Sequence, residues 1–126
     1  MAEISFTDRE VDVMGVLWDV GTATVAEVRE RLHDELAYTT VLTVLRTLEE
    51  KGYVGHEEAG RAHRYYPRVT REAAGKSALQ RLQRKVFGGS AELLLTQLVG
   101  DRELSEEELR RMRRLLDERL GEEGEP

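Results

Sequence analysis

Apolar and polar positions alternate along most of this chain with the period of a helix. The pattern is clearest in residues 37–52, where four apolar residues recur three or four positions apart: Val41, Val44, Leu45 and Leu48. The opposite face carries hydroxyl groups, one arginine and one acid: Thr39, Thr43, Arg46, Thr47 and Glu50. A merely solvated face in such a highly charged chain would more often be rich in Glu and Lys. Because short side chains let a backbone approach closely, the pattern favours a helix that enters the major groove of DNA.

Two shorter helices are predicted ahead of this segment. Thr7 to Glu10 and Thr24 to Glu27 both follow the capping-box pattern, in which a hydroxyl residue precedes a Glu by three positions and begins a helix. Apolar residues follow both boxes, and Gly21 ends the first helix. Only a short polar turn, residues 33–36, separates the second helix from residues 37–52. This order predicts a helix-turn-helix whose second helix carries the exposed polar face.

The period changes after Gly52. Residues 53–56 and 62–67 are short and rich in aromatic and β-favouring side chains, and Gly60 lies between them. This pattern predicts a two-stranded hairpin, and a helix-turn-helix followed by such a hairpin is a winged helix. Three cationic or titratable side chains would lie on the wing: Arg61, His63 and Arg64. Cations at such positions can reach backbone phosphates or a minor groove.

The second half of the chain is predicted to be helical and rich in leucine. Thr70, Ser90 and Ser105 are the expected N-caps, and residues 91–99 are apolar around almost the whole helix, so they need partners on several sides. We expect a homodimer interface that includes Leu82, Val86, Leu93, Leu94, Leu98, Leu109, Met112 and Leu116. The alternative is that these helices complete the core of a monomer.

The predicted fold class is therefore mainly α with a small β-hairpin wing. An N-terminal winged helix-turn-helix would bind DNA with residues 1–69, and a C-terminal helical region would dimerise through residues 70–126. The expected DNA contacts are Tyr38, Thr39, Thr40, Thr43, Arg46, Arg61, His63 and Arg64. For Tyr38, packing in the core is an equal alternative, and for Arg46 the alternative is an ion pair with Glu49 or Glu50.

Composition narrows how such a protein could read DNA. The chain contains no Asn, and its three Gln lie outside the predicted reading head, so the usual bidentate contact to adenine is absent. Direct readout would come from Arg46 to a guanine and from threonine methyl groups to thymine methyl groups. The net charge of −6 disfavours long-range attraction to DNA, although local cations can still contact phosphates. We expect weak binding to non-specific DNA.

Composition also excludes several other classes of protein. The absence of Cys rules out disulfides, thiolate metal sites and cysteine nucleophiles. The three histidines share no metal-ligand spacing, and no nucleophile lies beside a base in a catalytic pattern, so neither an enzyme nor a cofactor is expected. The N-terminus lacks a basic stretch followed by an apolar one, and no apolar run is long enough to insert into a membrane. We expect a cytoplasmic protein.

The residues also resemble a known family over nearly the full length of the chain. The most specific pieces are Thr39-Thr40-Val41 with Leu45, Leu48 and Lys51-Gly52, then Gly60-Arg61 with Tyr65-Tyr66-Pro67, then Phe87-Gly88-Gly89-Ser90. In this order and spacing they resemble the penicillinase-repressor family of bacterial transcription regulators, the BlaI/MecI type with the CopY copper repressors as a branch. The resemblance implies a winged-helix dimer that binds a palindromic operator and represses transcription. It places Thr39, Thr40, Thr43 and Arg46 on the recognition helix, and Arg61 and Arg64 on the wing.

The chain departs from the family pattern in two places. The copper branch carries a cysteine-rich C-terminal motif, and a chain without Cys cannot sense copper through thiolates. Antibiotic-responsive members are cut by a membrane-bound sensor protease at an Asn-Phe bond after the Gly-Gly break. The matching bond here is Gln97-Leu98, which is therefore the candidate site of cleavage, with a sensor protease as the candidate partner.

Two other functions are compatible with the same residues. A winged helix can serve as a protein–protein interaction module without contacting DNA, and the acidic balance favours that alternative. A repressor could also be controlled by a small apolar effector held between the leucine-rich helices. The sequence thus leaves both proteolysis and a ligand as means of inactivation.

Overall fold

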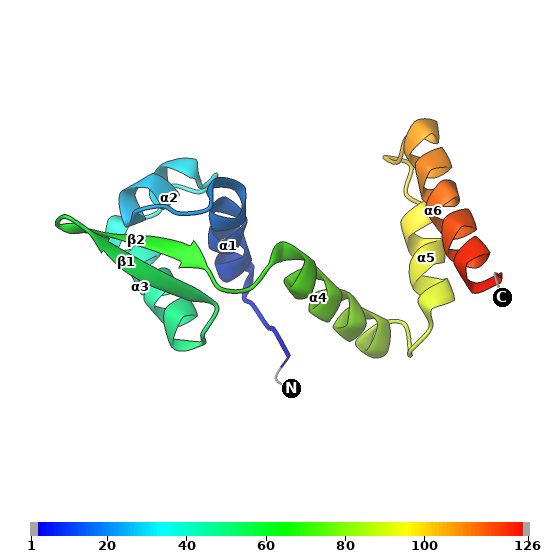
Figure 1. Ribbon diagram of the computed structural model, residues 1–126, viewed down its shortest axis with the longest axis horizontal. Helices are drawn as coiled ribbons and strands as arrows, with labels where there is room; N and C mark the ends of the chain where they lie inside the picture. The colour runs from blue at the N-terminus through cyan, green and yellow to red at the C-terminus, as the bar shows by residue number, and fades with distance from the viewer. Residues whose placement is uncertain (1–2, 125–126) are drawn as a thin grey trace. The chain divides into compact units, whose positions relative to one another are not determined.

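The helices and strands follow the order that the hydrophobic pattern predicts. The computed structural model describes residues 3–124 (Figure 1). Its elements are α1 (Asp8–Val20), α2 (Val25–Arg31), α3 (Tyr38–Glu50), β1 (Val54–Ala59), β2 (Ala62–Pro67), α4 (Arg71–Lys85), α5 (Ala91–Val99) and α6 (Glu106–Gly124). The predicted mainly α fold with one hairpin is confirmed.

Both predicted capping boxes begin their helices. At α1 the Thr7 hydroxyl accepts a hydrogen bond from the Glu10 amide at 3.2 Å, and the Glu10 carboxylate accepts one from the Thr7 amide at 2.8 Å. Thr24 and Glu27 repeat this arrangement at α2. Helix α1 ends at Gly21, whose φ of 86° is a conformation that side chains with a Cβ rarely adopt. The sequence therefore determines these two helix starts locally.

The core of the first unit is formed by α1, α2, α3 and the base of the hairpin. Its members that are completely excluded from solvent are Val13, Met14, Leu17, Val28, Val41, Leu45, Leu48 and Val54. Burying each such aliphatic side chain contributes about 1.5–3 kcal/mol. Three of them, on α3, belong to the apolar stripe that the sequence predicts, so packing on the core turns the opposite face of α3 outward.

The hairpin is antiparallel, with His56 opposite Tyr65 and Glu58 opposite His63. Gly60 lies in the connecting turn with φ of 67°. Figure 1 shows the turn projecting beyond α1, α2 and α3. On the other side of β2, Ala23 adds an isolated bridge: its amide donates to the Tyr65 carbonyl at 3.0 Å and its carbonyl accepts from the Tyr65 amide at 2.8 Å. Ala23 has no strand pattern around it in the sequence, so this third segment was not predicted.

The chain divides into two compact units, one up to Gln80 and one from Arg81 onward. The first unit includes the start of α4, where Ala74 is buried and the Ser77 hydroxyl exchanges two hydrogen bonds with the Ile4 backbone. The predicted assignment of DNA binding to residues 1–69 and dimerisation to residues 70–126 concerns function, and it stays a prediction.

The second unit keeps its leucines on the surface of the single chain. No side chain in residues 81–122 is buried. In α5 even Leu93 and Leu98 are largely exposed, although Ser90 caps the helix as expected, accepting from the Leu93 amide at 3.1 Å. Among residues 3–124, no helix is both long and apolar enough to span a membrane.

Candidate nucleic-acid interface

Helix α3 presents the hydroxyl-rich face that the sequence predicts. Thr39, Thr43 and Arg46 are exposed, while Thr40 is half-buried. The Thr43 hydroxyl donates to the Thr39 carbonyl at 2.9 Å, which fixes its rotamer but leaves its oxygen lone pairs and its methyl group available. Tyr38, at the start of the helix, is 48% exposed and therefore is not packed in the core. The face can approach a surface closely and can offer both polar and methyl contacts.

Arg46 is the cation on this face, and its guanidinium is not held by an acid. Within the described residues it forms no ion pair, so the alternative pairing with Glu49 or Glu50 is not found. Glu49 instead lies 2.6 Å from His56 Nδ1. A guanidinium with all its donors free can make the bidentate contact that recognises guanine.

The end of α3 is attached to α1 through a buried carboxylate. Lys51 Nζ lies 2.9 Å from both carboxylate oxygens of Glu10, whose side chain is only 5% exposed. Burial alone would raise the pKa of Glu10, but its hydrogen bonds with Lys51 and Thr7 outweigh burial and hold that pKa below its ordinary value. No local pattern in the sequence indicates this pair, because Glu10 is already explained as a capping residue and Lys51 lies 41 positions away.

The wing residues do not behave alike. Arg61 and His63 are exposed, and Arg61 forms no ion pair within residues 3–124. The His63 ring stacks on the His56 ring, with centroids 4.5 Å apart and an angle of 14° between the planes. Arg64 lies nearer the base of the hairpin, where its Nη1 is 2.8 Å from Glu27 of α2. Arg61 and His63 therefore lie toward the tip of the wing, whereas Arg64 contacts α2.

The wing also packs against the C-terminal part of α3. Tyr65 of β2 is 2% exposed, and the His56 ring lies 5.6 Å from its ring. Burial raises the pKa of Tyr65, and the nearby carboxylate of Glu49 raises it further, so the phenol stays neutral. The 2.6 Å contact between His56 Nδ1 of β1 and Glu49 of α3 also joins the wing to the C-terminal part of that helix.

The residues predicted for dimerisation lie in the second unit and are exposed or half-buried there. Leu82, Val86, Leu93, Leu98 and Leu116 are exposed, and Leu94, Leu109 and Met112 are half-buried. The candidate cleavage bond, Gln97-Leu98, lies inside α5 with both side chains exposed.

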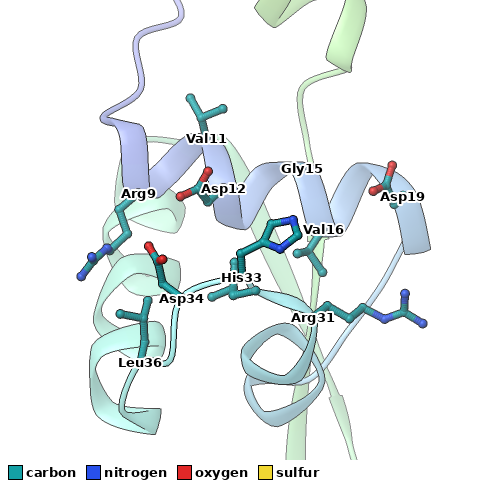
Figure 2. A pocket seen from close by; sticks show the side chains of 11 residues that line it. Arg9, Val11, Asp12, Gly15, Val16, Asp19, Arg31, His33, Asp34 and Leu36 are labelled. Atoms are coloured by element: carbon teal, nitrogen blue, oxygen red, sulfur yellow. The ribbon is translucent and has the colours of Figure 1, made fainter.

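A hollow of about 420 Å³ lies between α1 and the turn that leads to α3 (Figure 2). Figure 2 shows Arg9, Asp12 and Asp19 on α1, facing Arg31, His33 and Asp34 on the other side. Both acidic and basic side chains line this hollow. None of its residues belongs to the polar face of α3 or to the wing. Among residues 3–124, no cluster of side chains is suited to hold a metal ion.

Comparison with known proteins decides the family. The family model described as penicillinase repressor matches residues 6–118. The chain belongs to the penicillinase repressor family. It is 46% identical over 63 residues to the transcriptional regulator BlaI of Mycobacterium tuberculosis, an alignment that covers 48% of this chain and 46% of that protein. The chain thus spans about half the length of the curated BlaI relatives that it matches. It is 24% identical over 114 residues to the penicillinase repressor of Bacillus licheniformis, covering 89% of each.

Solved structures support the same fold. The DNA-binding domain of the repressor BlaI, a solution structure, superposes with a TM-score of 0.51 at 29% identity, covering 58% of this chain and 93% of that one. A MarR family protein from Bacillus stearothermophilus gives a TM-score of 0.53 over 97% of this chain and 78% of that one. Its 19% identity supports the winged-helix fold alone. The predicted winged helix and the predicted family are both confirmed.

Proposed function

We propose that this member of the penicillinase repressor family is a DNA-binding transcriptional repressor that binds a palindromic operator as a homodimer. The observation that carries the proposal is the outward face of α3, where threonines surround Arg46, which forms no ion pair within the described part of the chain. The names of relatives point the same way, since they include a repressor with a DNA-binding domain and a penicillinase repressor.

On this proposal α3 enters a major groove and the wing lies over the flanking backbone. Arg46 contacts a guanine, and Thr39, Thr40 and Thr43 contact thymine methyl groups or phosphates. Tyr38, Arg61 and His63 contact the sugar-phosphate backbone. Arg64 was predicted to do the same, but its guanidinium is held by Glu27 of α2.

The leucine-rich face of the second unit supports the homodimer. Several large apolar side chains of α5 and α6 are exposed in the single chain, including Leu93, Leu98, Leu116 and Leu120. A second copy related by two-fold symmetry would cover such a surface on both chains, and a two-fold protein matches a palindromic operator. The proposed interface residues are the eight predicted from the sequence.

Two means of induction are compatible with this arrangement. A sensor protease could cut at Gln97-Leu98, but this bond lies within a helix, so α5 would have to unfold locally first. Alternatively, a small apolar effector could bind between the leucine-rich helices and alter the dimer. Incubation of the purified dimer with the cognate sensor protease, followed by mass spectrometry of the fragments, separates the two, because only proteolytic induction predicts cleavage between Gln97 and Leu98.

The decisive experiment is binding of the full chain to DNA from upstream of its own gene and to scrambled DNA, across a series of salt concentrations. We expect a preference of about 10³-fold or more for the cognate DNA, together with a steep salt dependence. The net charge of −6 predicts weak binding to the scrambled duplex. Equal binding to both duplexes at every salt concentration would instead favour the protein–protein module.

A further inference from the structure

Arg64 attaches the base of the wing to the start of α2. Its Nη1 donates to Glu27 Oε1 at 2.8 Å, and its Nη2 donates to Glu27 Oε2 at 3.4 Å and to the Thr22 carbonyl at 3.2 Å. The next residue along β2, Tyr65, is bridged to Ala23 through both of its backbone groups. Two adjacent residues of β2 therefore hold it to the start of α2 and to the turn before it. Tyr65 does so through its backbone, and Arg64 does so through its side chain.

Glu27 is fixed in place from two sides. It is the last residue of the Thr24 capping box, and the same carboxylate accepts hydrogen bonds from the guanidinium of Arg64. The hydrogen bond from Arg64, followed by those from Thr24, lowers the pKa of Glu27. The carboxylate is therefore ionised at neutral pH, and its position is set by the start of the helix.

The outer part of the wing has less support: His56 pairs with Glu49 of α3, but within residues 3–124 no side chain from Glu57 to His63 forms a hydrogen bond or ion pair with a helix. From His56 to His63 every residue of the hairpin is exposed, and a two-stranded hairpin alone is only marginally stable. Arg64 lies four positions after Gly60, a length of roughly 13 Å for an extended strand. A tilt of about 10° at the base would thus move the turn by roughly 2 Å, more than a phosphate contact tolerates.

We propose that Arg64 is a positioning residue whose fork on Glu27 sets the angle of the wing, so that Arg61 rather than Arg64 contacts the DNA backbone. The inference rests on the proposed DNA-binding function. It predicts that Arg64 needs its planar fork and not merely its charge, because Nη1 binds Glu27 while Nη2 reaches the Thr22 carbonyl, whereas an ammonium carries all its donors on a single nitrogen.

The first test needs no DNA. Amide hydrogen exchange of Ala23 and Tyr65 is measured in the full chain for wild type, Glu27→Gln, Arg64→Lys and the control Glu30→Gln. A glutamine at position 27 can still complete the capping box. Glu30 is an exposed residue of the same helix, and it forms no ion pair within the described residues. We expect exchange in the first two variants to rise roughly two- to fivefold, as for the loss of a partly exposed ion pair, with no change in Glu30→Gln. Unchanged exchange in both would overturn the proposed attachment, whatever the protein binds.

The second test measures DNA affinity against salt for the same variants, for Arg64→Ala and for Arg61→Ala. A positioning role predicts that Glu27→Gln, Arg64→Lys and Arg64→Ala all weaken binding relative to Glu30→Gln without changing the salt slope. It also predicts that Arg61→Ala costs less in the Glu27→Gln background than in wild type, since Arg61 is then already misplaced. A change in folding stability alone would not produce this coupling.

The opposite results identify Arg64 as a phosphate contact. Arg64→Ala would then flatten the salt slope by about 0.9 for each half-site, Arg64→Lys would bind nearly as well as wild type, and Glu27→Gln would tighten binding by freeing the guanidinium. A wild-type protein that prefers no DNA would overturn the proposed function and the role of Arg61. In that case the exchange measurement still decides whether Arg64 holds the wing.

Discussion

Lys51 and Glu10 are 41 positions apart in sequence, yet the lysine ammonium lies 2.9 Å from both oxygens of the glutamate. Glu10 also caps the start of α1, and Lys51 follows the last residue of α3. The pair therefore fixes the end of α3 to α1, the first helix of the fold. Because Glu10 is almost completely buried, its partner is needed to compensate its charge.

Replacing Lys51 should destabilise the first unit. Lys51→Met leaves the buried carboxylate of Glu10 without its cation, and we expect a loss of about 2 kcal/mol in the free energy of unfolding. This is less than for a fully buried pair, since the lysine side chain is 39% exposed. Urea unfolding measures the loss, and Lys76→Met, at an exposed site of α4, is the control. Equal stability of the two variants would contradict a structural role for the pair.

The same pair makes stability depend on pH in the acid range. Because the pKa of Glu10 in the folded chain lies below its ordinary value of 4.5, its contribution is complete above that value and is lost as pH falls through the folded pKa. The free energy of unfolding of wild type should therefore fall between pH 6 and pH 3 more steeply than that of Glu10→Gln. Unfolding curves at several pH values provide the comparison, and parallel pH profiles would count against it.

Replacing Arg46 should weaken binding to cognate DNA more than binding to scrambled DNA. We expect Arg46→Ala to cost about 1–3 kcal/mol on the operator and to relax the preference at one base pair in each half-site. Binding to an operator series with single base changes measures both effects. Arg102→Ala, in the loop before α6, is the control. An equal loss on cognate and scrambled DNA would mean that Arg46 contacts phosphate rather than a base.

An acidic side chain on the leucine-rich face of α6 should separate the proposed dimer. Leu116→Glu places a charge where a second chain would cover it, and we expect the dimer dissociation constant to rise at least about tenfold. Arg114→Glu adds the same side chain two positions away, which points to another side of the helix. Sedimentation equilibrium measures both variants. A dimer that persists unchanged in Leu116→Glu would place the interface elsewhere.

Local signals in the sequence were sufficient to predict the helices and the hairpin. The boxes at Thr7 and Thr24 begin helices through hydrogen bonds within one turn, and Gly60 permits the positive φ of the hairpin turn. The apolar stripe of α3 predicted which of its faces is buried. These features depend on neighbours in the sequence, so they can be recognised without knowing the tertiary structure.

The ion pairs of the site could not be predicted in this way. Glu27 and Arg64 are 37 positions apart, and nothing local indicates which carboxylate the guanidinium reaches. Arg64 was therefore assigned to phosphate because it lay on the predicted wing. One signal was present, however: Glu10 and Glu27 are each the last residue of a capping box, so their carboxylates are already oriented and can accept a distant cation at little entropic cost.

The exposed second unit also affects how much folded protein is present. Without a buried side chain in residues 81–122, the single chain gains little there to offset the entropy of ordering three helical segments. If a second copy covers these leucines, folding and association of this unit become one equilibrium that obeys mass action. Its melting temperature then rises with protein concentration, and the abundance of the chain in the cell determines what fraction of it is competent to act.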